Sequence, residues 1–120
     1  MDITGVKLRC SQQVYYVYTN NLFVRRNSLC VVETEHGIDI GRVFKKLTSL
    51  PDESIKVGGK LLRLATQDDL NLLPQIEDLE DRAFAVCKEK IIEKKLEMKL
   101  VMVKSLFDKT KIIFYFVADG

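Results

Sequence analysis

The sequence predicts an α+β protein with a small N-terminal β-sheet or partial barrel, a kinked helical connector, and a helix packed on a C-terminal antiparallel β-hairpin. Three observations lead to this fold class. Short β-branched and aromatic runs, separated by polar breaks, fill the first half of the chain. A long stretch with apolar residues at helical spacing follows, and two apolar runs joined by a short turn come last.

Four short strands are expected in the first half. A polar Ser-Gln-Gln break separates the first two, and a Glu-His-Gly connection between the last two predicts a β-hairpin. Gly41, inside the second arm of that hairpin, predicts a bulge or a close backbone approach. The expected strands cover residues 5–9, 14–18, 30–34 and 38–44.

A connector over residues 47–59 is the expected boundary between two subdomains. It carries Pro51, Gly58 and Gly59, residues that are typical of turns and linkers. We therefore expect a β-rich subdomain over residues 1–59 and a helix-plus-hairpin region over residues 60–120. A short strand over residues 60–64 is expected to open this second region.

The helical stretch begins after Thr66, which with Asp69 three residues later is close to a capping box. Pro74 lacks a backbone N–H and crowds the preceding turn, so we expect the helix to break or kink there. A second helix is then expected over residues 75–94. Its apolar face contains Ile76, Leu79, Ala83, Val86, Cys87 and Ile91, with Phe84 at the edge.

The C-terminal hairpin is expected to consist of strands over residues 98–105 and 111–118. Both faces of residues 112–117 are apolar, which is typical of a strand in a sheet that is covered on both sides. One amphipathic helix covers one side only. The other side is expected either to be covered by the N-terminal sheet or to remain open for a second chain. In the second case the sequence predicts a homodimer formed through the C-terminal sheet.

Composition limits the functional classes. The formal net charge is +2, with ten Lys/Arg and six Asp/Glu in residues 1–63 and nine and eleven in residues 64–120. The first residues lack the pattern of a signal peptide, and no run approaches the ~20 apolar residues of a membrane span. Three widely spaced cysteines do not suit a disulfide framework. These features predict a cytoplasmic protein.

No catalytic motif is expected to operate in this chain. The nucleophile-elbow pattern GxSxG and the phosphate-loop pattern GxxxxGK[ST] are both absent from the sequence. His36 is the single histidine, no cysteine lies near it in sequence, and it is interpreted as a turn residue. Cys87, on the apolar helix face, is interpreted as a small core residue.

Two charged groups are candidate binding sites. An acidic group on the helix is either a solvated face or a docking surface for a basic partner, and it contains Glu77, Asp78, Glu80 and Asp81. Two basic pairs precede it in the chain. With nearby aromatic residues they could neutralise the phosphates of a single strand and stack on its bases, or the aromatic residues could belong to the core of the sheet. They are Arg25-Arg26 and Lys45-Lys46, with Tyr15, Tyr16, Tyr18 and Phe23 as the aromatic residues.

Three blocks of sequence together resemble the polymerase-suppressor C-terminal domain family, which includes bacterial YaaT-like sporulation proteins. They are VVETEHGIDIGRV at residues 31–43, RLATQDDL at residues 63–70, and residues 83–120 with CKEKI, LEMKLV and KIIFYFVADG. The resemblance spans nearly the whole chain, and the last block is its most specific part.

The resemblance implies a non-catalytic adaptor subunit of a cytoplasmic regulatory complex, with two helical partners of the YlbF and YmcA type. It links that complex to a phosphorelay, to developmental control and to RNA processing by a membrane-associated ribonuclease. The family's iron–sulfur cysteines would lie in a cysteine-rich part beyond residue 120, so we expect no cofactor in this chain. A direct single-stranded RNA-binding module and an iron–sulfur protein are the two alternatives.

Overall fold

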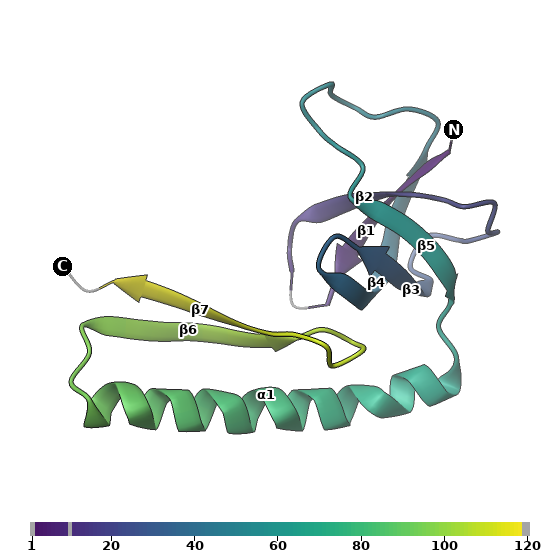
Figure 1. Cartoon of the computed structure of the whole chain (residues 1–120). Coiled ribbons are helices and arrows are strands. Elements are labelled where there is room, and N and C mark those ends of the chain that lie inside the picture. Colours follow the sequence, from purple (N-terminus) through teal and green to yellow (C-terminus); the bar gives the residue numbers. More distant parts are fainter. Residues whose placement is uncertain (1, 10, 119–120) are drawn as a thin grey trace. The chain divides into compact units, whose positions relative to one another are not determined.

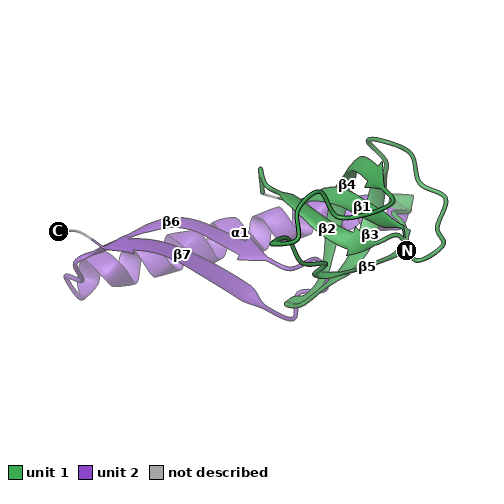
Figure 2. Ribbon diagram, turned by 90° about the horizontal axis from the view of Figure 1, so that it is seen from above, with its two compact units in different colours: residues 1–67 green, residues 68–120 purple. Residues whose placement is uncertain are grey.

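The chain forms two units in the computed structural model, residues 1–67 (unit 1) and residues 68–120 (unit 2) (Figure 2). The structure describes residues 2–9 and 11–118. Unit 1 contains strands, and unit 2 contains a helix and a two-stranded sheet (Figure 1). The predicted α+β class is confirmed.

Five strands of unit 1 close into a barrel with the order β1-β2-β5-β3-β4. Neighbouring strands are antiparallel, except for β2 and β5, which meet in parallel where Tyr18 pairs with Lys60. The strands are β1 (Ile3–Leu8), β2 (Val14–Tyr18), β3 (Leu29–Thr34), β4 (Gly37–Leu47) and β5 (Gly59–Leu64). Because β5 completes the barrel, the units divide after Gln67, further along the chain than the boundary expected after Gly59.

Small β-branched side chains fill the barrel interior, as a narrow five-stranded barrel requires. The buried polar pair inside unit 1 is satisfied, since the Thr4 and Thr19 hydroxyl oxygens lie 2.7 Å apart. The core consists of Val6, Val17, Val24, Cys30, Val32, Val43 and Leu61. Leu61 comes from β5, so this strand contributes to the core as well as to the hydrogen-bonded ladder.

The β1–β4 ladder contains a bulge close to the glycine where one was expected. Gly41 is a site of close approach, since an added Cβ would lie 3.3 Å from Leu8 Cδ2. The bulge itself lies further along β4. Gly5 pairs with Lys45 and Val6 pairs with Val43, which leaves Phe44 without a partner on β1. A bulge of this kind redirects a side chain relative to the regular alternation of the strand.

Unit 2 begins with one continuous helix, α1 (Gln67–Glu93). The expected start after Thr66 is confirmed, and the expected division into two helices at Pro74 is wrong. Proline removes one hydrogen bond to the carbonyl four residues earlier. The apolar stripe continues on both sides of Pro74, from Leu70 to the fully buried Ile76, and such packing contributes most of the stability of helices in proteins.

The hairpin of unit 2 pairs β6 (Met98–Ser105) with β7 (Ile112–Ala118), and α1 runs alongside it (Figure 1). The predicted helix-on-hairpin arrangement is confirmed. The buried residues Leu100 and Val103 lie on β6, whereas β7 is exposed along most of its length. In the part of the chain that the structure describes, no helix has the length and apolar character needed to cross a membrane.

Candidate functional site

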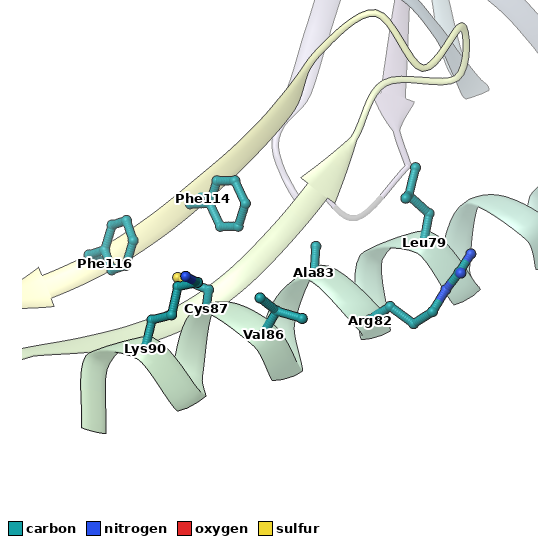
Figure 3. Close-up of a pocket in the computed structure, with 8 residues that line it drawn as sticks. All are labelled: Leu79, Arg82, Ala83, Val86, Cys87, Lys90, Phe114 and Phe116. Carbon is teal, nitrogen blue, oxygen red and sulfur yellow. The ribbon is translucent and has the colours of Figure 1, made fainter. Parts of the chain in front are cut away.

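An apolar groove lies in unit 2 between one face of α1 and the strand β7. Its volume is about 540 Å³. Figure 3 shows Leu79, Ala83 and Cys87 extending from α1 toward the side where β7 carries its two phenylalanines. The lining residues are Leu79, Arg82, Ala83, Val86, Cys87, Lys90, Phe114 and Phe116.

The spacing of these residues explains why they share one groove. The helical residues recur three or four positions apart, which places them on one face of α1. Phe114 and Phe116 are two positions apart on β7, so they lie on the same face of the hairpin. Their ring centroids are 6.4 Å apart, and the ring planes differ by 16°. The sequence therefore builds two facing apolar walls.

Solvent reaches the groove, and its polar border is cationic. Val86 is 53% exposed and Phe116 is 42% exposed, so these apolar side chains are only partly covered. Arg82 and Lys90 add positive charge to the lining. Arg82 also forms an ion pair with Asp78, one turn earlier on α1, at 3.0 Å. An apolar groove with a charged border is a typical docking site for an amphipathic helix.

Cys87 lines this groove and is half-buried, so it is less covered than its interpretation as a core residue implied. Cys30 is the buried cysteine, and burial in the barrel raises the pKa of its thiol. Cys10 lies outside the described residues. Over residues 2–9 and 11–118, no group of three or more His, Cys, Asp or Glu side chains is placed to hold a metal ion.

Iodoacetamide is expected to alkylate Cys87 at least about 10-fold faster than Cys30 in a Cys10→Ser protein, because access and thiolate content both control the rate. Cys87 is half-buried, whereas Cys30 is fully enclosed and its pKa is raised. Mass spectrometry of peptides over a time course measures both rates. Equal rates in the folded protein would contradict the described burial of Cys30.

The acidic residues predicted as a docking surface do not form one group. Glu77, Asp78 and Asp81 are exposed on α1. Glu80 is 8% exposed, and its Oε2 accepts a hydrogen bond from the backbone N–H of Ser105 at 2.8 Å. Glu80 therefore does not belong to the exposed acidic surface, because its carboxylate is a buried acceptor for β6.

The two predicted basic pairs are brought together in unit 1, around two phenylalanine rings. Arg25 Cζ lies 5.8 Å from the centroid of the Phe23 ring, and Lys46 Nζ lies 5.5 Å from it. The Phe44 ring has Arg26 Cζ at 5.7 Å and Lys45 Nζ at 5.9 Å. These are cation–π distances. We call this group, together with Lys7, the basic–aromatic surface.

Sequence reasoning missed Lys7 and Phe44. Lys7 Nζ is 4.7 Å from the Phe44 centroid, the shortest of these contacts. The sequence did not reveal the bulge in β4, and the regular alternation of a strand does not predict where Phe44 points.

Tyr15, in contrast, stabilises the barrel, since its hydroxyl donates a hydrogen bond to the Gly58 carbonyl at 2.8 Å. His36 lies at the β3–β4 turn, with Nε2 3.9 Å from the Glu35 carboxylate.

Two hollows border the basic–aromatic surface. One has a volume of about 440 Å³ and is lined by Arg26, Val43, Phe44, Lys45 and Lys46. The other is about 330 Å³ and includes Phe23 and Lys46 among its lining residues, together with Asp2. Lys46 therefore contributes to both hollows, which connects the two rings through one cationic side chain.

Comparison with known proteins gives a family match in the second half of the chain and a relative that aligns along nearly all of it. Residues 59–120 match the family model described as PSP1 C-terminal conserved region. The chain is similar to the Stage 0 sporulation protein YaaT of Bacillus subtilis (strain 168), with 32% identity over 120 residues. The alignment covers 99% of this chain and 44% of that relative.

The family match begins at residue 59, so it includes β5 of the barrel as well as all of unit 2. The chain spans less than half the length of the relative. No solved structure matches the chain. The matched region and the identity to YaaT together show that the chain belongs to the PSP1 C-terminal region family of YaaT-like proteins.

Proposed function

We propose that the chain is a non-catalytic adaptor in a cytoplasmic regulatory complex and that the groove between α1 and β7 binds an amphipathic helix of a partner protein. The observation that carries this proposal is the groove itself, an apolar surface that remains accessible within unit 2. Large exposed apolar surfaces on folded proteins mark interaction sites.

A helical partner fits the groove better than an extended peptide does. The helical wall presents residues at every three to four positions along α1, which matches the ridge spacing of a second helix. Helix-in-groove docking uses apolar anchors at the same spacing. Arg82 and Lys90 favour acidic residues beside those anchors, through charge complementarity.

The family supports the biological setting. The relative from Bacillus subtilis is named a Stage 0 sporulation protein, which suggests a regulatory role. The family resemblance implies helical partners of the YlbF and YmcA type and a link to a phosphorelay and to RNA processing by a ribonuclease. In this proposal the groove is the surface that recruits those helical partners.

Val86→Glu is expected to weaken binding of YlbF-like or YmcA-like protein by at least about 10-fold, because docking would bury a charged carboxylate in place of an apolar contact. Isothermal titration calorimetry with the purified proteins measures the change. Ile92→Glu is the matched control, since Ile92 is a 68% exposed β-branched residue on the same helix that does not line the groove. Equal losses in the two variants would contradict docking in the groove.

Two further measurements distinguish a helical partner in the groove from a contact at the acidic face and from a second copy of the chain. Glu77→Lys with Asp81→Lys, at exposed acidic residues other than Asp78, the partner of Arg82, is expected to leave affinity within about 3-fold if the groove dominates. A larger loss would assign the contact to the exposed acidic face. Light scattering over a wide concentration range tests for the homodimer expected from the apolar β7. A dimeric mass that Val86→Glu converts to a monomeric one would identify a second copy as the occupant.

A further inference from the structure

We propose that the barrel of unit 1 binds a single-stranded nucleic acid on the basic–aromatic surface, with Phe23 and Phe44 stacking on bases and the surrounding cations contacting phosphates. This function is additional to the docking of a protein partner by unit 2. The surface consists of Lys7, Phe23, Arg25, Arg26, Phe44, Lys45 and Lys46.

The two rings are available for stacking. Phe23 is 75% exposed and lies in the segment between β2 and β3, where it contributes nothing to the barrel core. Phe44 is half-buried and occupies the bulge of β4, surrounded by three cationic side chains. Bases of a single strand stack on such rings largely irrespective of sequence, and a base would take the place of a cation on the ring face.

The cations form an uncompensated group. No ion pair within residues 2–9 and 11–118 involves any of the five cationic side chains, whereas Lys60 on the same barrel pairs with Glu33 at 3.8 Å. Asp2 is the carboxylate that shares a hollow with Lys46. Unit 1 also carries ten Lys/Arg against six Asp/Glu. Like charges held together in this way repel each other, and a polyanion relieves that repulsion.

The rings distinguish a single strand from other polyanions. Bases in a duplex are already stacked on each other and cannot reach Phe23 or Phe44. An acidic peptide or an anionic vesicle would use the charges but would not need two rings interleaved with them. Alternation of cations with exposed rings is the arrangement that binds single strands. RNA and DNA share this chemistry, so the experiment compares them.

Fluorescence anisotropy with a labelled oligouridylate of about 12 nucleotides tests the proposal on the full chain. Affinity is expected to fall with salt, with a slope of log K against log[salt] no steeper than about −3.5 if all five cations contact phosphates. Lys45→Glu with Lys46→Glu is expected to weaken binding at least 10-fold, an order-of-magnitude estimate, and to reduce the slope by about 1.4. Lys94→Glu with Lys95→Glu, an identical charge change on an exposed part of unit 2, is the control.

Stacking is tested separately from charge. Phe23→Ala is expected to lower affinity by roughly 10-fold without changing the salt slope, and circular dichroism checks that the exposed position leaves the fold intact. A preference for oligouridylate over oligodeoxyuridylate would identify RNA as the ligand, and the opposite preference would identify DNA. The proposal is overturned if oligouridylate does not bind at about 50 mM salt, or if Phe23→Ala leaves its affinity unchanged. It is also overturned if a duplex, polyglutamate or anionic vesicles bind as tightly as oligouridylate does.

Discussion

Gly59→Ala is expected to destabilise unit 1 by about 3 kcal/mol or more, because an added Cβ would overlap the backbone carbonyl oxygen of Glu33. The same Cβ would lie 2.9 Å from the carbonyl carbon of Glu33 and 3.2 Å from Thr34 Cα. All three neighbours are backbone atoms of β3, so a rotamer change cannot relieve the overlap. The two strands would have to separate where β5 begins.

The loss would be cooperative because β5 joins two parts of the barrel. It pairs with β3 through Gly59 and Thr34, and it meets β2 at Lys60 and Tyr18. Displacing β5 also removes Leu61 from the core, where it is fully buried. Urea unfolding followed by tyrosine fluorescence reports mainly on unit 1, since Tyr15, Tyr16 and Tyr18 all lie on β2.

Lys60→Ala is the control for this prediction. Lys60 is exposed, is adjacent to Gly59 on β5 and forms only a surface ion pair with Glu33. Its replacement is expected to change stability by less than about 0.5 kcal/mol. A Gly59→Ala protein whose stability stays within about 1 kcal/mol of the unsubstituted protein would contradict the close approach of β5 and β3.

Glu80→Ala is expected to destabilise unit 2 by about 2 kcal/mol, because it removes the acceptor of a buried backbone donor. Glu80 Oε2 accepts from the Ser105 N–H at 2.8 Å, and Ser105 is fully buried. This hydrogen bond joins the middle of α1 to the end of β6. Hydrogen bonds to charged groups are stronger than neutral ones, and an orphaned buried N–H carries its full desolvation cost.

Two variants make this second prediction specific. Glu77→Ala removes an exposed carboxylate from the same helix, and its effect on stability is expected to be below about 0.5 kcal/mol. Glu80→Gln keeps an acceptor oxygen and is expected to lose less than Glu80→Ala. Thermal unfolding followed by circular dichroism at 222 nm measures α1 directly. Equal stability of Glu77→Ala and Glu80→Ala would refute the structural role assigned to Glu80.

Local patterns predicted much of the fold. The strands Val14–Tyr18 and Met98–Ser105 have the expected bounds, because β-branched and aromatic composition and flanking polar breaks mark both. The role of β5 was not predictable in the same way. Gly58 and Gly59 have the composition of a linker, yet Gly59 is required by a close contact with β3 that is distant in sequence. The course of α1 through Pro74 likewise depends on packing and not on local propensity.

The candidate sites were likewise predictable only where a local sequence pattern reveals them. Doublets of basic residues were visible in the sequence, and barrel closure brings Arg25, Arg26, Lys45 and Lys46 around two rings. Phe44 was missed because a bulge breaks the alternation of β4. Glu80 was placed with the exposed acids because helical periodicity cannot say which part of α1 a hairpin covers. The apolar face of α1 was predicted from spacing, but its partial exposure in the groove was not.

In the proposed division of function, unit 2 binds a helical partner in its groove and unit 1 binds a single strand on the basic–aromatic surface. The most direct test measures both affinities for two variants of the full chain. Val86→Glu should lose at least about 10-fold for the YlbF-like partner while retaining oligouridylate binding, and Lys45→Glu with Lys46→Glu should show the reverse. Parallel loss of both ligands in either variant, with the fold intact, would contradict this division of function between the two units.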